Sequence, residues 1–180
     1  IWGYARGAFD DTLAVVYDFC TGRGAHFPME FLGSWSGTLV RDEYKGYEQV
    51  TALHDRQGAG CPAHARRKYD ELLKNKDSPV AAEAVQRIAA IYRIERELRD
   101  LSPQLRLAQR QAFAVPFWES LHVWLTLEHR RGADRMATAK ARKDSLNHWQ
   151  ALTQNLRDGD VPLDNNHLEN LMRPWAMACS

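Results

Sequence analysis

The stretch SGTLVRDEYKGY, residues 36–47, places two acids directly after a short apolar run. The run TLV is typical of a short strand, and the glycine before it marks a turn. In open α/β sheets, the residues that follow a strand are held rigidly while their side chains project into a crevice. Asp42, with Glu43 beside it, is therefore well placed to bind a metal ion. An acid in this position is also a common turn or helix-cap residue, and that alternative stays open.

Strand-like segments flank this stretch, and helical segments follow it. IWGYAR and LAVVYDFC are rich in aromatic and β-branched residues, and QGAGC has the form of a further short buried strand. After Pro62, the residues Ala65 and Tyr69 begin an apolar pattern with helical spacing. The sequence predicts an α/β fold that changes from strands to helices along the chain.

Everything after Ser78 has a helical pattern. Ser78 and Pro79 form a cap and first-turn pair, Pro103 marks a bend, and Gly132 precedes a last long helix. Charged runs such as RIERELRD are typical of a solvated face. These signals divide the chain into residues 1–77, 78–131 and 132–180. The apolar residues expected to form the later part of the core are Phe117, Leu121, Trp124, Leu125, Met136, Leu146, Trp149, Leu152 and Leu156.

The composition excludes several classes of protein. The 180 residues carry 24 Lys and Arg against 23 Asp and Glu, so any basic surface must be local. The cysteines Cys20, Cys61 and Cys179 are odd in number and widely spaced, which argues against a disulfide framework and for a reducing compartment. No apolar run approaches the roughly 18 residues that span a bilayer. We expect a cytoplasmic protein with no membrane segment.

A basic segment, GCPAHARRKYDEL, begins the first helical pattern. Cys61 and His64 have the spacing of half a zinc site, but no second pair with suitable spacing follows. Arg66, Arg67 and Lys68 cover more than one face of a helix, so at least one of them should reach a nearby anion such as a phosphate. The alternative interpretation is an exposed helix beside a buried Cys61.

The stretch VPLDNNHLEN, residues 161–170, admits two interpretations. Asn166 as the N-cap, with Glu169 three positions later, has the form of a capping box, in which the glutamate accepts a hydrogen bond from the backbone N–H of the cap. This leaves unexplained the density of polar residues around Asp164 and the Arg173 that follows one turn later. The other interpretation is that Glu169 takes part in chemistry.

These segments, in this order, resemble the catalytic core of the transposases of the insertion sequence 66 family. The most specific parts are the motifs D-x-Y-x-G-Y, C-x-A-H-A-R-R-K and D-N-N-x-x-E, and the resemblance covers nearly the whole chain. It implies a ribonuclease H-like mixed sheet with a mainly helical insertion. Residues 1–77 would form part of this core, 78–131 the insertion, and 132–180 the C-terminal helices that complete the core. Asp42 matches the second aspartate of the family's acidic triad and Glu169 matches its glutamate.

The resemblance also implies a chemistry. Carboxylates can hold two Mg²⁺ or Mn²⁺ ions roughly 3.5–4 Å apart and so support phosphodiester cleavage and strand transfer. Asp42 and Glu169 would be metal ligands in a DDE-type transposase. Its partners would be the ends of the insertion sequence, the target DNA and further copies of the chain. The residues expected to contact DNA phosphates are Arg66, Arg67, Lys68 and Arg173, and His64 either orients a phosphate or simply packs in the fold.

The triad's first aspartate has no counterpart in this sequence. In the family it lies on a strand before the WGYAR strand, and Asp10 and Asp11 come after that strand. We therefore expect a fragment that lacks a central strand, has unpaired strand edges and is inactive in isolation. Two other classes stay open: a non-catalytic DNA-binding or assembly remnant, and a ribonuclease H-like nuclease. A purely structural helical protein would bind neither DNA nor metal.

Overall fold

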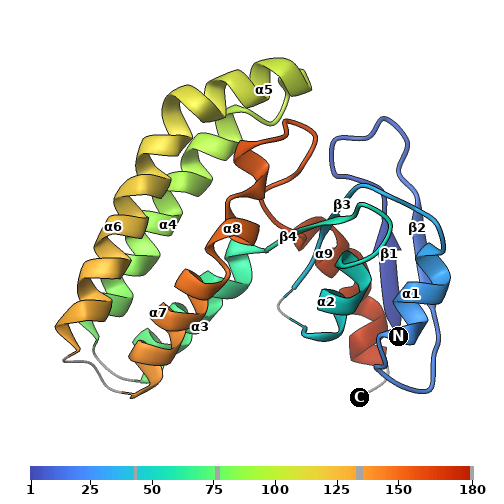
Figure 1. The fold of residues 1–180 in the computed structure, drawn as a ribbon, viewed down its shortest axis with the longest axis horizontal. Coiled ribbons are helices and arrows are strands. Elements are labelled where there is room, and N and C mark those ends of the chain that lie inside the picture. Colours follow the sequence, from blue (N-terminus) through green and yellow to red (C-terminus); the bar gives the residue numbers. More distant parts are fainter. Residues whose placement is uncertain (43, 76–77, 133–135, 179–180) are drawn as a thin grey trace. The chain divides into compact units, whose positions relative to one another are not determined.

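The computed structural model describes residues 1–42, 44–75, 78–132 and 136–178. The chain forms two compact units (Figure 1). The α/β unit comprises Ile1–Cys61 and Asp160–Ser180, and the helical unit comprises Pro62–Gly159. The predicted α/β class is confirmed, with small sheets and a majority of helix. The predicted boundary after residue 77 lies outside the described residues, and the division into three segments stays a prediction.

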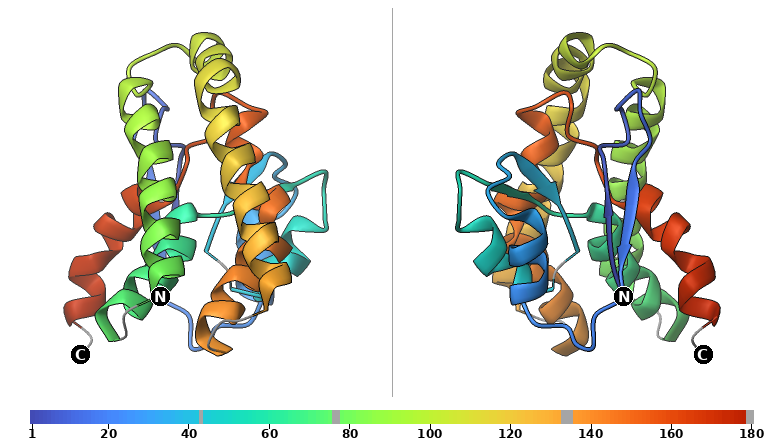
Figure 2. Two further views of the ribbon diagram at one scale, coloured as in Figure 1. Left: turned by 90° about the vertical axis from the view of Figure 1, so that its left-hand side faces the viewer. Right: turned by 90° about the vertical axis from the view of Figure 1, so that its right-hand side faces the viewer.

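The described strands of the α/β unit form two separate pairs. Strands β1 (Trp2–Ala5) and β2 (Val15–Asp18) are antiparallel, with Trp2 opposite Asp18, and Figure 2 shows them side by side. Strands β3 (Thr38–Val40) and β4 (Gln57–Ala59) are parallel. All four were expected from their aromatic, β-branched and apolar residues. Each pair has only two strands, so both depend on packing against other elements.

Two short helices of the α/β unit were not predicted. Helix α1 spans His26–Leu32 and helix α2 spans Gly46–Thr51. Neither is long enough to show a helical repeat, and neither begins with a capping side chain. Pro28 lies in the first turn of α1, where its missing N–H is no loss. The third helix, α9 (Asn166–Ala178), was expected from its polar first turn.

A buried arginine joins the loops of the α/β unit. Arg56 is only 6% exposed, and its guanidinium donates to the carbonyls of Trp35 at 2.8 Å and Val50 at 3.1 Å. A further hydrogen bond, at 2.6 Å, reaches the Gly33 carbonyl at the end of α1. Because a buried guanidinium needs acceptors for its N–H groups, Arg56 holds α1, α2 and the entry to β3 together.

The helical unit consists of packed helices with one π-helical turn. Its elements are α3 (Pro62–Asn75), α4 (Pro79–Glu97), α5 (Pro103–Gln109), the π turn η1 (Arg110–Ala114), α6 (Val115–Arg131), α7 (Met136–Asn147), α8 (Trp149–Leu152) and the 3-10 turn η2 (Gln154–Leu156). The predicted cap is confirmed, because the Ser78 hydroxyl accepts from the Ala81 N–H at 3.2 Å. Gly132 ends α6 with φ of 66°, in the left-handed region that favours glycine. No helix built from the described residues is long and apolar enough to cross a membrane.

The predicted core is wrong at two positions of the helical unit. Phe117 is 47% exposed, and its neighbour Trp118 is buried instead, at 2%. The π turn before α6 adds a residue to one turn and so rotates the face that is buried. Met136 is 89% exposed, and the buried side of α7 carries small or polar residues such as Ala141 and Ser145. The expected last long helix is broken into α7, α8 and η2.

A buried ion pair joins the π turn η1 to α4, and hydrogen bonds from the same arginine join both to the segment around η2. Arg110 is fully buried and donates to both carboxylate oxygens of Glu95 at 2.8 Å. It also donates to the carbonyls of Asn155 at 2.9 Å and Asp158 at 3.0 Å. The expectation that RIERELRD is a solvated run is therefore wrong for Glu95, whose side chain is 10% exposed.

Candidate active site

Asp42 directly follows strand β3 of the α/β unit. The pairing with β4 continues one residue beyond the strand, because the Arg41 N–H donates to the Ala59 carbonyl at 3.0 Å. The half-buried Asp42 comes next and uses Oδ1 to accept the Tyr44 N–H at 3.1 Å. This hydrogen bond closes a tight turn and fixes the carboxylate relative to the strand end. Glu43, the other acid of the pair, lies outside the described residues.

The residues of the D-x-Y-x-G-Y motif after Asp42 pack closely around its turn. The Tyr44 ring lies so close to Gly46 that a Cβ there would overlap it, and the Tyr44 hydroxyl donates to the Arg23 carbonyl. The Tyr47 ring meets the buried Trp2 ring edge to face, with centroids 5.6 Å apart. Because Trp2 belongs to β1, these aromatic contacts fasten the turn that carries Asp42 to the other strand pair.

The surroundings of Tyr47 also affect its own ionisation. Burial, together with the negative charge of Asp42, raises the pKa of Tyr47 to about 12, although the nearby Arg41 guanidinium acts in the opposite direction. Arg41 lies over the Tyr47 ring, 6.0 Å from its centroid. Tyr47 is therefore neutral at physiological pH and does not compete with Asp42 for a cation. Both tyrosines stand in the sequence motif, but no local pattern indicates that they position Asp42.

Glu169 lies in the first turn of α9, where the helix dipole favours a negative charge. It is half-buried. In the expected capping box Glu169 accepts the backbone N–H of Asn166, but the structure pairs this N–H with Asp164. The backbone N–H and the side chain of Asn166 both donate to Asp164, at 3.0 and 2.7 Å. Asp164 is therefore the residue that caps this end of the helix, which explains the polar density noted in the sequence.

Asp42 and Glu169 belong to the same compact unit although they are far apart in sequence. Helix α9 packs against β1, where a Cβ at Gly3 would overlap the Met172 side chain. Among residues 1–42, 44–75, 78–132 and 136–178, no group of three or more His, Cys, Asp or Glu side chains could hold a metal ion. The carboxylate oxygens of Asp42 and Glu169 are the donor type that Mg²⁺ prefers, but the described residues do not complete a site.

The residues expected to contact DNA are divided between the two units. His64, Arg66, Arg67 and Lys68 lie on α3, at the start of the helical unit, whereas Arg173 lies on α9. Lys68 pairs with Asp144 at 3.0 Å, and Arg66 pairs with Asp70 at 3.4 Å. Arg67 and Arg173 have exposed side chains. Cys61, just before α3, is 1% exposed, in agreement with its interpretation as a buried residue.

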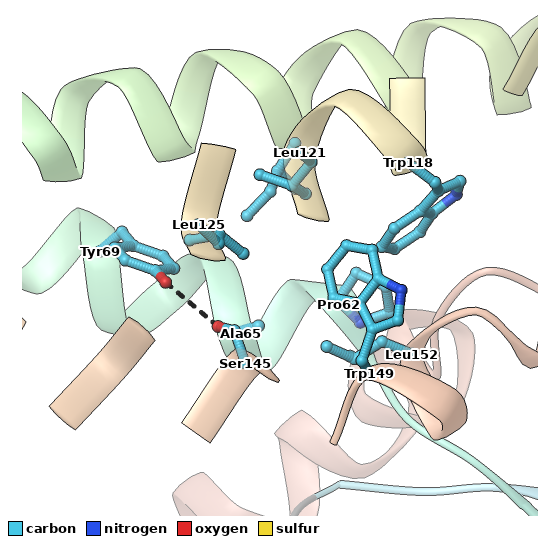
Figure 3. A pocket seen from close by; sticks show the side chains of 10 residues that line it. Pro62, Ala65, Tyr69, Trp118, Leu121, Leu125, Ser145, Trp149 and Leu152 are labelled. Carbon is cyan, nitrogen blue, oxygen red and sulfur yellow. Dashed lines mark hydrogen bonds between the residues drawn. The ribbon is translucent and has the colours of Figure 1, made fainter. Parts of the chain in front are cut away.

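A small cavity lies in the core of the helical unit, among α3, α4, α6, α7 and α8 (Figure 3). Trp118, Leu121 and Leu125 point into it from α6, and the Tyr69 hydroxyl is hydrogen-bonded to the Ser145 hydroxyl at 3.1 Å beside it. Its volume of about 10 Å³ leaves room for about one water molecule. This cavity is a packing gap, because sites for organic ligands are far larger.

The comparison with known families agrees with the motifs around Asp42 and Glu169. The sequence profile described as "Transposase IS66 family" matches residues 1–178. The chain belongs to this family. Its members are transposases, and the match includes both the turn after β3 and the first turn of α9.

Relatives of the family occur in Sinorhizobium fredii. The uncharacterised protein y4hP is 34% identical over 198 residues, covering 98% of this chain and 36% of y4hP. The uncharacterised protein y4jD is 34% identical over 170 residues, covering 91% of this chain and 33% of y4jD. The chain thus spans about a third of the length of these relatives. No solved structure is significantly similar to it.

Proposed function

We propose that this chain is part of the catalytic core of a DNA transposase, and that Asp42 and Glu169 are two of the three carboxylates of its active site. The observation that carries the proposal is their placement in one compact unit. Asp42 follows a strand end and Glu169 lies in the first turn of α9, in motifs that the family shares. A strand end and a helix start are rigid supports for metal ligands.

The strand pairs support a ribonuclease H-like core. The chain has one antiparallel pair and one parallel pair, and each leaves strand edges without a partner among the described strands. In the proposed core, a further strand that carries the third carboxylate joins the two pairs into one mixed sheet. Such a strand would cover the open edges, which a stable fold requires.

The residues of this chain would prepare the site for divalent cations. When bound, Mg²⁺ or Mn²⁺ supplies charge stabilisation and an activated hydroxyl for phosphodiester cleavage and strand transfer. The turn closed by Tyr44 orients Asp42, and the Trp2–Tyr47 contact holds that turn on β1. The described residues offer two candidate ligands, Asp42 and Glu169, for a site that takes three, and we propose that this chain alone does not cleave DNA.

Contacts to DNA would come from both units. Arg67 and Arg173 have exposed side chains, which phosphates in solution can approach. Arg66 and Lys68 pair with carboxylates, and DNA binding by them requires that these pairs be exchanged for phosphate contacts. His64 would orient a phosphate. The proposed partners are the insertion-sequence ends and the target DNA, in the bacterial cytoplasm and in a complex of several copies.

A strand-transfer assay tests the proposal. Labelled DNA with the terminal repeats of the element is incubated with Mg²⁺ and either this chain or a longer protein that contains it. We expect products only from the longer protein, and loss of these products in its Asp42→Asn and Glu169→Gln variants. Asp11→Asn changes an exposed acid and serves as the matched control. Turnover by this chain alone, or full activity of Asp42→Asn, would contradict the proposal.

A second candidate is a non-catalytic DNA-binding or assembly remnant. It is favoured by the absence, among the described residues, of a group of three metal-binding side chains. In this case DNA binding should survive Asp42→Asn and Glu169→Gln, weaken steeply with salt, and be accompanied by no cleavage in any longer protein. Cleaved but unjoined strands would indicate a nuclease instead.

A further inference from the structure

The side-chain oxygen of Asn165, just before α9, is buried and has no hydrogen-bond partner among the residues that the structure describes. Asn165 as a whole is half-buried. A buried acceptor without a donor costs stability, and such atoms in native proteins normally serve a bound water, a bound ion or a catalytic role. The position of Asn165 next to the proposed metal ligand Glu169 indicates which of these applies.

An asparagine at this position would ordinarily cap the helix. The Asn165 carbonyl accepts the Glu169 N–H at 3.1 Å, the first hydrogen bond of α9, so Asn165 stands at the N-cap position. An N-cap asparagine normally accepts a backbone N–H of the first turn through its side-chain oxygen, but Asn165 Oδ1 accepts none. The side chain that serves this helix end is Asp164, whose two oxygens accept from Asn166. The helix therefore does not use the Asn165 oxygen.

We propose, on the basis of the proposed metal-binding role of Glu169, that Asn165 Oδ1 is a further ligand of the same divalent cation. The hydrogen bond between their backbones brings the two residues together at one helix end. The Glu169 carboxylate cannot satisfy Asn165 Oδ1, because both are acceptors. A divalent cation satisfies both oxygens at once.

An amide oxygen suits this role chemically. Carbonyl oxygens, like carboxylates, are hard donors of the kind that Mg²⁺ and Mn²⁺ bind. The α/β unit already carries 11 Asp and Glu against 6 Lys and Arg. Because Asn165 is neutral, it adds a ligand without adding negative charge beside a DNA phosphate. A neutral ligand therefore limits the repulsion between the site and its proposed substrate.

Mn²⁺ binding in the absence of DNA, measured by electron paramagnetic resonance, tests the proposal on this chain and on a longer protein that contains it. We expect Asn165→Ala to weaken Mn²⁺ binding at least tenfold. Asn165→Asp keeps an oxygen at this position and should bind Mn²⁺ at least as tightly as the wild type. Asn170→Ala, at an exposed asparagine of the same helix, is the matched control and should leave the affinity unchanged.

Urea unfolding without metal separates a metal ligand from a helix cap. Loss of an N-cap side chain lowers the unfolding midpoint, whereas removal of an unpaired buried oxygen leaves it unchanged or raises it. We expect the second result for Asn165→Ala, together with a smaller increase in the midpoint on addition of Mn²⁺ than in the wild type. A lowered midpoint in the absence of metal would overturn the proposal.

The Glu169→Gln variant separates this inference from the proposed function. If Glu169→Gln loses Mn²⁺ binding and Asn165→Ala keeps it, the role of Asn165 is overturned and Glu169 remains a ligand. The same result is expected if only a water molecule pairs with Asn165 Oδ1. If Mn²⁺ binding survives both substitutions, or neither protein binds Mn²⁺, the metal-binding roles of both residues are overturned.

Discussion

The hydroxyl of Tyr17 on β2 donates a hydrogen bond to the backbone carbonyl of Leu171 on α9, at 3.0 Å and across 154 positions of sequence. The contact lies two residues beyond Glu169 on the same helix. Beside it, Met172 packs over Gly3 of β1. The hairpin of β1 and β2 thus fixes the helix that carries Glu169, and the aromatic contacts of Trp2 fix the turn that carries Asp42.

Replacing Tyr17 by phenylalanine should loosen α9. We expect the free energy of unfolding to fall by about 0.5–1.5 kcal/mol, the net contribution of one such hydrogen bond. Urea unfolding of the two proteins measures the difference. Leu13→Ala, at an exposed position of the same hairpin, should change stability by much less. Equal effects of the two substitutions would show that the hydrogen bond to Leu171 contributes nothing.

Gly46→Ala should destabilise the turn that carries Asp42. Alanine normally stabilises a helix relative to glycine, but at this position its Cβ overlaps the Tyr44 ring. We expect a net loss of roughly 1–3 kcal/mol from the forced displacement of the ring. Gly22→Ala is the matched control, because its Cβ would lie 3.6 Å from the Phe27 ring, an ordinary contact. An unchanged or raised urea midpoint for Gly46→Ala would contradict the assigned packing of Tyr44.

Arg110→Met should be among the most damaging changes in the helical unit. It leaves Glu95 without its bidentate partner and removes one hydrogen-bond donor from each of two carbonyls, and breaking a buried pair in this way costs about 3–5 kcal/mol. Arg131→Met removes an exposed arginine that pairs with Glu128, and should cost under about 1 kcal/mol. Thermal unfolding of the two variants compares the pairs directly. Similar losses would mean that burial does not determine the contribution of the Arg110 pair.

The free energy of unfolding should fall in alkaline solution, because Tyr47 loses its phenolic proton less readily in the folded chain. Its pKa is raised to about 12 in the folded chain, against about 10 in an unfolded one. The folded state therefore holds the phenolic proton more tightly, and its advantage is complete below pH 10 and lost as pH rises toward 12. Tyr47→Phe should reduce this alkaline loss by on the order of 1–2 kcal/mol. Burial also raises the pKa of Tyr4, so part of the dependence remains.

Urea unfolding at a series of pH values, for the wild type and Tyr47→Phe, measures this difference. The two proteins should show similar slopes of stability against pH below pH 10 and diverge above it. Parallel curves throughout would contradict the assignment to Tyr47.

Local signals predicted the elements that carry their own patterns. The four strands followed from β-branched and aromatic residues, and α3 and α4 from Pro62 and the Ser78–Pro79 pair. Elements without a local signal were missed. Helices α1 and α2 are too short for a repeat, and the π turn shifted the buried face from Phe117 to Trp118. The breaks between α7, α8 and η2 were missed for the same reason.

For the candidate site, too, some features could be predicted from the sequence and others only from the tertiary structure. The sequence alone identified the family, because Asp42 and Glu169 lie in motifs whose residues and order match it, and it proposed these two residues for the site. Their supports depend on contacts between residues that are distant in the chain, and no local pattern encodes such contacts. Only the tertiary structure placed Trp2 against Tyr47, Tyr17 on α9 and Asp164 at the start of that helix. It also showed that Lys68 and Arg66 pair with carboxylates. Which charged side chains pair depends on how the helices pack, and composition does not reveal it.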